Sequence, residues 1–326
     1  MTISATAATA PAAVDALVRI ARDAAHPGPG TAADPACRGC ARGPEVLADR
    51  PDGLVVRHGN TVAKAHDEAA DPRELRARLA IAADPRLAGI LLPPLFPPAG
   101  SPAVPGRLVS HWPYGSPVDP ADPDAAPWEE TATLLARLHA VPPESLPGPP
   151  PPARGPAKAA LAIARMRRET RHPAAGDVLR AWHRLPARAR GEAAAPGPAG
   201  LCHGDLHLGQ LVRSPAPDGP WLLIDVDDLG IGDQAWDLAR PAAWFAAGLL
   251  APEVWGRFLD TYTAAGGAAV DPADPWARLD VPARALTVQS AALALVRAAR
   301  EEQEPDETDT AVLEACVRIA RLAPEL

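Results

Sequence analysis

The stretch LCHGDLHLGQLV, residues 201–212, sets two histidines, an aspartate and a glutamine between two apolar ends. Short runs rich in leucine and valine are typical of buried strands, so both ends are expected to lie in a core. Polar side chains on a loop between buried strands are well placed for chemistry, because the strands position them and the loop exposes them. The stretch therefore predicts a functional loop that is anchored by its apolar ends.

A second segment, WLLIDVDDLGIGDQAWDLARP (221–241), follows and carries Asp225 twenty positions after Asp205. The intervening SPAPDGP has the composition of a turn, so QLVR and WLLIDV are expected to pair as a hairpin. That hairpin would bring the loop with Asp205 beside the loop with Asp225. Two carboxylates and the amide of Gln210 that converge in this way suit a hard divalent cation, which prefers oxygen ligands.

The composition limits the class of protein. The chain has 326 residues, 47% of them apolar, which is enough for a globular fold; its 41 prolines are expected in connections. The formal net charge of -8 argues against a general nucleic-acid binder. Prolines, arginines or acids interrupt each apolar stretch, so we expect no membrane-spanning segment, and the first residues lack the pattern of a signal peptide. These features predict a cytoplasmic protein with small-molecule or cationic partners.

The sequence predicts both strands and helices, and they fall in different parts of the chain. GLVVRHG and TVAKAH predict a hairpin at Gly59-Asn60, and GILLPPL and GRLVSHW predict further strands of the same sheet. Helices are predicted over 11–25, over 71–82 with Asp71 as N-cap, and at intervals after Gly115. We therefore predict three parts: an N-terminal helix and Pro/Gly/Cys-containing arm (1–45), a β-rich part (46–112) and a helical part (113–326).

Lysine is rare in this chain. Among 32 basic residues only Lys64 and Lys158 are lysines. The strand period of TVAKAH places Lys64 on one face with Val62. A lysine kept within a strand is a candidate ligand-binding residue, and the alternative is a solvated lysine on an edge strand.

Four cysteines, at positions 37, 40, 202 and 316, form no evident disulfide framework. The pair in CRGC could be half of a zinc site, although no second CxxC or HxxxH follows; the alternative is two thiols in an irregular, glycine- and arginine-rich loop. His203 and His207 also have metal-ligand spacing. Gly204 and Gly209 argue against the helix that such a histidine pair requires.

Three motifs in order resemble the aminoglycoside phosphotransferase family of kinases. HGDLHLGQLV is similar to that family's HGDxHxxN catalytic loop, IDVDDLGIGDQAWDLA to its metal-binding segment, and LLARLHAV to a helix just inside its large lobe. The resemblance covers roughly residues 50 to 250. It implies an α+β, bilobal protein-kinase-like fold, with a small β-rich N-lobe and a larger, mostly helical C-lobe.

The resemblance also implies roles for residues around the phosphates. Asp205 would accept or aim the proton of the acceptor hydroxyl, and Asp225 would bind the Mg²⁺ that bridges the nucleotide phosphates. Gln210 would supply an amide oxygen to the metal. The family has asparagine at this position, so the longer glutamine side chain would have to fold back or contact the metal through water. Otherwise the glutamine would indicate a protein that binds nucleotide without fast turnover.

A further set of residues would bind ATP or GTP or support the loop. Lys64 would contact the phosphates, with Glu74 as a candidate partner, although a solvated first-turn acid explains Glu74 equally well. Backbone groups of Val109, Ser110 and His111 would meet the purine. The residues expected to brace the loop or add charge near the metal are His203, His207, Asp227, Asp228 and Asp237.

The resemblance implies a nucleotide-dependent kinase that phosphorylates a hydroxyl of a small molecule, such as an aminoglycoside-like compound or another hydroxylated metabolite. The acidic run EEQEPDETD (301–309) predicts a solvated loop; folded over the acceptor site, it would attract a polycation. Two alternatives stay open. One is a nucleotide-binding pseudokinase or scaffold, and the other is a kinase of Ser or Thr in a peptide during natural-product maturation.

Overall fold

The computed structural model describes residues 11–26, 37–50, 53–95, 104, 106–194 and 199–322. The chain divides into two compact units. The first unit comprises Met1–Pro120, Pro147–Pro149 and Gly209–Ile224, and the second comprises Ala121–Leu146, Pro150–Leu208 and Asp225–Leu326. The division predicted between residues 112 and 113 falls within the first unit, which takes in two later segments of the chain.

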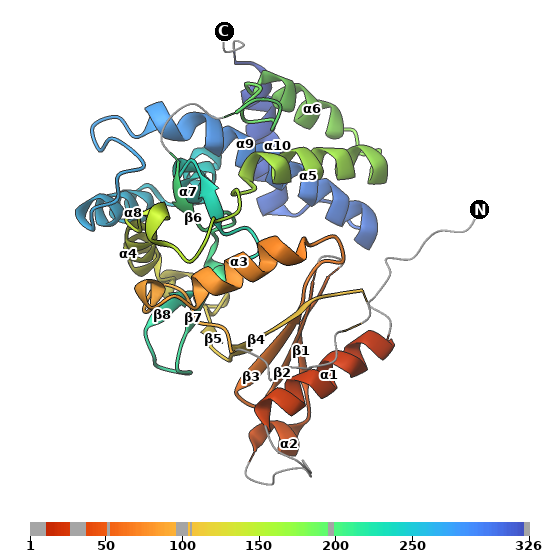
Figure 1. The fold of residues 1–326 in the computed structure, drawn as a ribbon. Coiled ribbons are helices and arrows are strands. Elements are labelled where there is room, and N and C mark those ends of the chain that lie inside the picture. Colours follow the sequence, from red (N-terminus) through yellow and green to blue (C-terminus); the bar gives the residue numbers. More distant parts are fainter. Residues whose placement is uncertain are drawn as a thin grey trace. The chain divides into compact units, whose positions relative to one another are not determined.

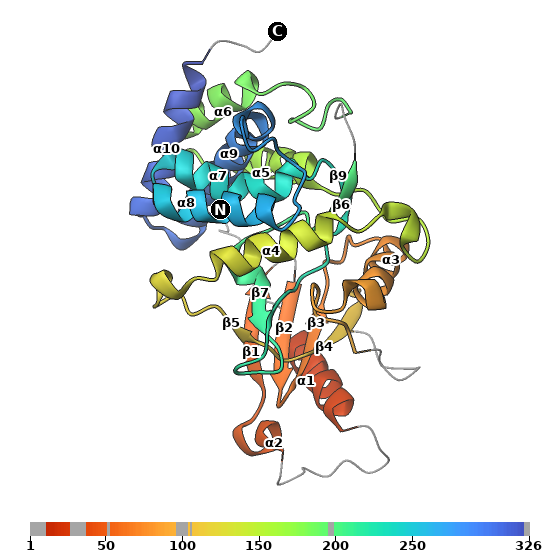
Figure 2. The same ribbon diagram turned by 90° about the vertical axis from the view of Figure 1, so that its left-hand side faces the viewer.

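The first unit contains a four-stranded antiparallel sheet. Its strands, in spatial order, are β1 (Glu45–Arg50), β2 (Gly53–His58), β3 (Thr61–Ala65) and β4 (Val109–Pro113). Buried and half-buried residues alternate along β2 and β3, as expected for strands covered on one face. The buried face, with Leu54 and Ala63, packs on Leu17 and Ile20 of helix α1 (Pro11–Ala25) (Figures 1 and 2). The predicted hairpin and first helix are both confirmed.

Two elements of the first unit were not predicted. Helix α2 (Arg38–Arg42) contains Cys40, and Cys37 occupies its N-cap position, so the expectation of an irregular loop around CRGC is wrong. Strand β1 is exposed on both faces apart from one half-buried residue, and therefore shows no alternation in its sequence. The rest of the predicted arm, residues 27–36, lies outside the described residues.

Other predictions for this unit are confirmed in part. Helix α3 (Pro72–Ala82) begins as predicted, because the Asp71 carboxylate accepts hydrogen bonds from the amides of Arg73 and Glu74. GILLPPL forms no strand: Leu91 and Leu95 make only isolated bridges, since Pro93 and Pro94 lack the N–H groups of a ladder. Between it and α3 lies the short helix η1 (Pro85–Leu87).

The predicted second hairpin is present in a small sheet of the first unit. Strand β7 (Leu211–Arg213) pairs with β8 (Trp221–Leu223), and β5 (Ser116–Pro117) pairs with the other edge of β7. The short helix η4 (Leu208–Gln210) precedes β7. The hairpin thus follows the functional loop directly and ends just before Asp225.

The second unit is mostly helical. Its elements are η2 (Pro123–Ala125), α4 (Trp128–His139), η3 (Pro143–Ser145), α5 (Gly155–Glu169), α6 (Ala175–Arg184), β6 (Gly200–Cys202), β9 (Gly230–Gly232), α7 (Ala235–Ala247), α8 (Pro252–Ala264), α9 (Trp276–Glu301) and α10 (Glu307–Ala320). Helix α9 packs against α5, α7 and α10, and α4 lies along α8 (Figure 2). Strands β6 and β9 form an antiparallel pair at the functional loop.

Helix α9 corrects one expectation. Among the described residues it is the single helix that is long and apolar enough to cross a membrane, by length and composition alone. The predicted interruption by Pro282 and the arginines does not end it. Its apolar residues, such as Val288 and Leu295, are buried against the surrounding helices. A helix at the centre of a folded unit is apolar for this reason.

Candidate active site

The predicted functional loop leaves β6 at His203, is not helical from His203 to His207, and ends in the short helix η4. Gly204 adopts a left-handed conformation, with φ of 86°, and a Cβ atom there would lie 2.3 Å from the carbonyl oxygen of Asp228. Only glycine permits this approach. The loop and the segment from Asp225 to Asp228 therefore pack backbone against backbone within the second unit.

Asp237, in the first turn of α7, holds the loop in place. Its carboxylate is 1% exposed and accepts hydrogen bonds from the backbone amides of His203 (2.6 Å) and Gly204 (2.8 Å). The predicted contact between Asp237 and the loop is thus present. Burial alone would raise the pKa of Asp237, but the hydrogen bond from His139 and the nearby donors outweigh burial and lower it.

His139, at the end of α4, extends this support. Its Nε2 lies 3.1 Å from Asp237 Oδ2, and its Nδ1 lies 2.8 Å from the hydroxyl oxygen of Tyr262. The Tyr262 oxygen also accepts a hydrogen bond from the amide of Ala269, at 3.1 Å. A neutral imidazole satisfies both contacts when Nε2 carries the hydrogen. Burial raises the pKa of Tyr262 to about 12, so its hydroxyl keeps its proton.

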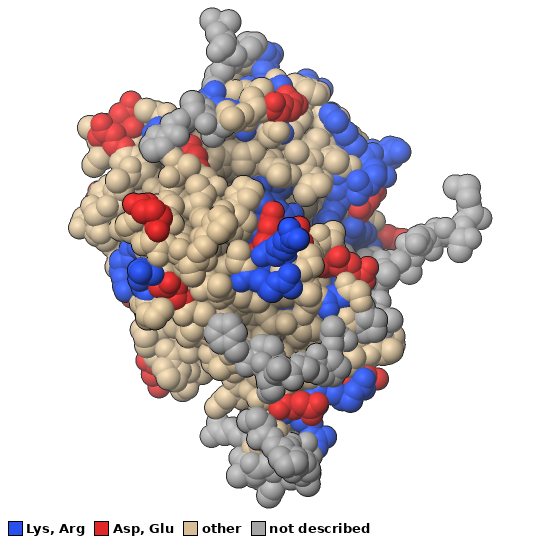
Figure 3. Space-filling model, viewed as in Figure 1, with Lys and Arg blue, Asp and Glu red and all other residues tan. Residues whose placement is uncertain are grey.

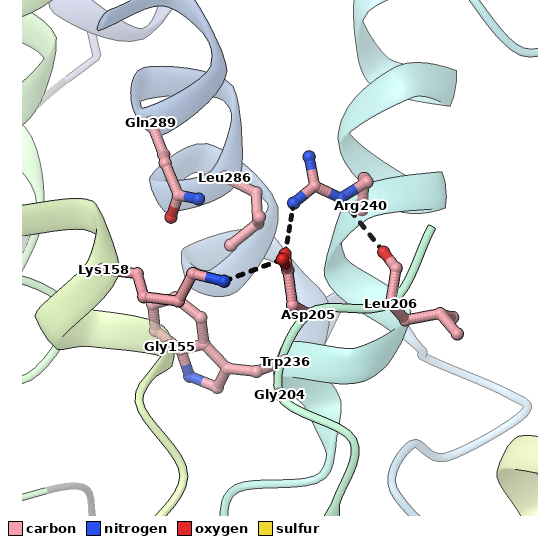
Figure 4. Close-up of a pocket in the computed structure, with 9 residues that line it drawn as sticks. All are labelled: Gly155, Lys158, Gly204, Asp205, Leu206, Trp236, Arg240, Leu286 and Gln289. Atoms are coloured by element: carbon pink, nitrogen blue, oxygen red, sulfur yellow. Dashed lines mark hydrogen bonds and ion pairs between the residues drawn. The ribbon is translucent and has the colours of Figure 1, made fainter. Parts of the chain in front are cut away.

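Asp205 lies between two cations (Figure 4). Lys158 Nζ of α5 is 2.8 Å from Oδ2, and Arg240 Nη2 of α7 is 2.9 Å from Oδ1. Burial opposes ionisation of Asp205, but the charges of Lys158 and Arg240 prevail and hold its pKa far below the ordinary value. Asp205 is therefore an anion at any pH at which a folded enzyme works.

Both cations also hold neighbouring groups. Lys158 Nζ lies 2.7 Å from Asp228 Oδ2, and Arg240 donates from Nε to the carbonyl oxygen of Leu206 at 3.0 Å. Burial by itself would lower the pKa of Lys158, yet the two carboxylates raise it. Sequence reasoning assigned neither cation. The signal for Lys158 was available, because it is one of only two lysines in the chain.

A small pocket opens beside Asp205. It is lined by Gly155, Lys158, Gly204, Asp205, Leu206, Trp236, Arg240, Leu286 and Gln289 (Figure 4). Gln289 of α9 is 5% exposed and points into the pocket; no described residue gives its side-chain amide a hydrogen bond. A buried amide of this kind is costly unless a ligand or water satisfies it. The pocket thus offers an unused polar group opposite the carboxylate.

The predicted metal-binding segment begins in an unusual conformation. Asp225 has φ of 63°, in the left-handed region that aspartate tolerates better than most residues. Its Oδ1 accepts a hydrogen bond from the amide of Asp227 at 3.3 Å, which closes a local turn. Both carboxylates are half-buried. Their oxygens are donors that suit Mg²⁺.

His207 connects the two acidic groups. Burial and the charge of Arg240 lower its pKa to about 4, whereas the carboxylates of Asp205 and Asp225 act in the opposite direction. The imidazole is therefore neutral at neutral pH. His203, by contrast, is fully buried behind the loop.

The other predicted residues lie in the first unit. Lys64 pairs with Val55 and Ser110 in the sheet, on the face opposite the one that packs on α1. Glu74 forms an ion pair with Arg78 at 3.0 Å, one helical turn further along α3. Gln210 is 8% exposed, and its backbone carbonyl oxygen accepts a hydrogen bond from the Ile224 amide at 2.9 Å. Their roles toward a nucleotide or metal stay predictions.

The predicted purine-binding residues form β4 itself. Val109, Ser110 and His111 pair with β3, and the carbonyl oxygen of His111 accepts a hydrogen bond from the Leu95 amide at 2.6 Å. The hydroxyl of Ser110 accepts a hydrogen bond from Trp112 Nε1 at 2.8 Å. Several polar groups of this stretch are thus used within the sheet, and contact with a purine stays a prediction.

Comparisons with known proteins agree with this geometry. Residues 46–280 match the model of the APH phosphotransferase enzyme family, which is more than half of the chain. No curated protein matches the chain at a significant level.

Solved structures share the fold at low identity. A choline/ethanolamine kinase family protein from Mesorhizobium loti is 16% identical, with TM-score 0.58, and the alignment covers 86% of this chain and 88% of that one. Choline kinase LicA from Streptococcus pneumoniae is 15% identical, with TM-score 0.52, and the alignment covers 85% of this chain and 92% of that one. A spectinomycin phosphotransferase in complex with ADP and spectinomycin is 13% identical, with TM-score 0.53, and the alignment covers 85% of this chain and 92% of that one. The predicted α+β, kinase-like fold is confirmed. The chain belongs to the APH phosphotransferase enzyme family, and it is an enzyme that transfers a phosphoryl group to a hydroxyl acceptor.

Proposed function

We propose that this enzyme moves the γ-phosphate of ATP or GTP to a hydroxyl group of a small molecule that binds in the pocket beside Asp205. The observation that carries the proposal is the carboxylate of Asp205, kept anionic by Lys158 and Arg240 at the wall of a cavity. The family supports phosphoryl transfer as the reaction. We further propose that it acts in the cytoplasm, without nucleic acid or membrane.

Asp205 acts by orientation more than by basicity. A carboxylate with so low a pKa is a weak base, but phosphoryl transfer has a loose transition state in which the acceptor proton leaves late. Asp205 holds the acceptor hydroxyl in line and receives its proton as the new bond forms. To do so it exchanges one of its two cationic partners for the hydroxyl. Lys158, once released, carries a positive charge beside the transferring group.

Asp225 and Asp227 are the residues of the second unit that would hold Mg²⁺. Their oxygens are hard donors, and the hydrogen bond from the Asp227 amide keeps Asp225 oriented. When bound, the metal would neutralise charge on the phosphates. Gln210 as a further amide ligand, Lys64 as a phosphate contact and Val109–His111 as the purine contact complete the proposal from the resemblance.

The charges of the pocket favour a neutral or acidic acceptor. Two cations, Lys158 and Arg240, and one carboxylate, Asp205, line it, so no surplus of acid is present for a polycation such as an aminoglycoside. The acidic run 301–309 does not line it either. Asp306 caps α10, and Asp309 pairs with Arg297 at 2.6 Å.

Surface charge supports the same choice. On the face shown in Figure 3, basic side chains gather over α5 and the adjoining helices. Exposed arginines of this region are Arg167, Arg168, Arg171 and Arg300. A basic surface would speed the approach of an acidic acceptor and slow that of a cationic one.

The test is phosphorylation by the full chain with Mg²⁺ and ATP or GTP. Hydroxy acids and neutral sugars are compared with aminoglycosides and choline, and the products are identified by mass spectrometry. Wild type and the exposed control Asp260→Asn are expected to phosphorylate an acidic or neutral compound, whereas Asp205→Asn is not.

Each other outcome has a distinct meaning. Equal background rates for wild type and Asp205→Asn, with nucleotide binding intact, would contradict the reaction and favour the scaffold alternative. Phosphorylation of cationic compounds alone would overturn only the acceptor class. Transfer to Ser or Thr of peptides, with no small acceptor, would favour the peptide-kinase alternative.

A further inference from the structure

Four potential metal ligands meet in the first unit, in a part of the chain that the proposed function does not use. His26 follows α1, Cys37 and Cys40 belong to the CRGC turn, and His58 ends β2. Cys40 Sγ lies 3.3 Å from His26 Nε2 and 3.5 Å from His58 Nε2, and Cys37 Sγ lies 3.9 Å from His58 Nε2. The four ligand atoms all lie within 4.8 Å of one another.

These separations match a tetrahedral zinc site. Bonds of about 2.3 Å to sulfur and about 2.0–2.1 Å to nitrogen place a sulfur and a nitrogen about 3.5 Å apart at tetrahedral angles. The observed sulfur–nitrogen distances of 3.3, 3.5 and 3.9 Å scatter around this value. Both cysteines are free thiols, so no disulfide occupies the position.

The backbone around the cluster is packed too tightly for the arrangement to be incidental. A Cβ atom on Gly39 would lie 2.3 Å from the Gly59 amide nitrogen, and one on Gly59 would lie 3.3 Å from Cys37 Sγ. Gly59 also has φ of 61°. Glycine at both positions lets the CRGC turn sit directly on the turn between β2 and β3. The two thiols are thereby aimed at His58.

The CRGC turn has its own hydrogen bonds. The Ala41 amide donates to the Cys37 carbonyl oxygen at 3.1 Å, and the Gly43 amide donates to that of Gly39 at 2.9 Å. The turn thus presents both sulfurs on one side without help from a metal. Two thiols and two imidazoles have only weak hydrogen bonds to offer one another, whereas a soft divalent cation would bind all four.

We propose that His26, Cys37, Cys40 and His58 form a Cys₂His₂ zinc site that ties the end of α1 and the CRGC turn to the β2–β3 hairpin. Four protein ligands leave no open position, so the site is structural. The sequence alone left metal binding by these thiols open, because the histidines lie 14 and 18 positions from Cys40, outside any HxxxH pattern. The proposal does not depend on the acceptor or on the proposed reaction.

The first experiment measures zinc content. The full chain is purified without a histidine tag under reducing conditions, and bound zinc is quantified by inductively coupled plasma mass spectrometry. Wild type is expected to carry one zinc per chain, and Cys40→Ser and His26→Gln to lose most of it. Cys316→Ala in α10 and His183→Gln in α6 are the matched controls outside the cluster, and both are expected to keep the metal.

A second measurement uses only the wild type, so it remains informative if the variants fail to fold. The zinc-free wild type is titrated with Co²⁺, and one equivalent is expected to give the visible absorption of tetrahedral, thiolate-bound cobalt, which Zn²⁺ then removes. Absence of these bands and of zinc in wild type, equal metal binding by Cys40→Ser, or a Cys37–Cys40 disulfide without metal would each overturn the proposal.

Discussion

Two aspartates of the second unit, Asp205 and Asp237, show how similar carboxylates are given different tasks. Burial opposes the ionisation of both, and neighbouring donors or charges lower the pKa of both. Asp237 is 1% exposed and is held by backbone amides and by His139. Asp205 keeps a quarter of its side chain exposed, and its partners are the ends of two long side chains, those of Lys158 and Arg240. Backbone donors fix a carboxylate, whereas long side chains leave it able to change partners.

The largest expected effect is on catalysis by Asp205→Asn. We expect kcat to fall about 10³-fold, because the amide neither receives the acceptor proton nor aligns the hydroxyl as an anion does. Steady-state kinetics measures the loss, with Asp260→Asn as control and circular dichroism to establish folding. A change of kcat smaller than about threefold would remove Asp205 from the mechanism.

The corresponding change at the second aspartate should act on stability. Asp237→Asn is expected to lower the free energy of unfolding by about 3–5 kcal/mol, because a neutral amide replaces a buried carboxylate that accepts from three donors and leaves some of those donors unsatisfied. Urea denaturation measures this. Asp205→Asn should cost less, since its side chain is partly solvated. If Asp205→Asn were the more destabilising of the two, the distinction between them would be wrong.

Lys158→Gln tests why Asp205 stays ionised. Loss of the ammonium group should raise the pKa of Asp205 towards the range in which activity can be followed, add an acid limb that the wild type lacks, and reduce kcat at neutral pH by at least about tenfold. Lys158→Arg keeps the charge and should restore the wild-type profile. An unshifted pH–rate profile in Lys158→Gln would assign the low pKa to Arg240 alone.

Stability should follow the same titration. The folded pKa of Asp205 lies below its ordinary value of 3.8, so its ionised form stabilises the fold above about pH 4. This contribution is lost as the pH falls through the folded pKa. In Lys158→Gln the folded pKa is expected to lie closer to 3.8, so less stability is lost as the pH falls and the loss is complete at a higher pH, which denaturation at a series of acidic pH values would detect.

The smallest expected effect is that of Tyr262→Phe. Removing the hydroxyl leaves His139 Nδ1 and the Ala269 amide without a partner, at a cost of about 1–2 kcal/mol, with kcat nearly unchanged. Thermal and urea unfolding measure it, and Tyr114→Phe is the control. A loss of kcat larger than that caused by Lys158→Gln would show that the Asp237 network does more than support the loop.

The regular elements were predictable where local signals are strong. Asp71 caps α3 through its side chain, and the turn at Gly59 allows the β2–β3 hairpin, so a few neighbouring residues determine each. Strand β1 offers no such signal because it is exposed on both faces. α2 is only five residues long, too short for a helical period to be read.

The candidate site was predictable only in its local part. Asp205 and Asp225 belong to contiguous motifs, whereas Arg240 reaches Asp205 from 35 positions away, and His139 reaches Asp237 across 98. Packing of α4, α5 and α7 brings these residues together, and no spacing in the sequence encodes that packing. Lys158 is the exception, since the rarity of lysine pointed to it as clearly as to Lys64.

The close approach of Gly204 to Asp228 affects how such an enzyme can diversify. The gap between the loop that carries Asp205 and the segment that carries Asp228 is set by main-chain atoms, so we expect it to survive replacement of the side chains around it. Leu286 and Gln289 on α9 line the same cavity without taking part in that contact. Substitutions of Leu286 or Gln289 are therefore expected to change the shape of the cavity while leaving the main-chain contact between Gly204 and Asp228 in place.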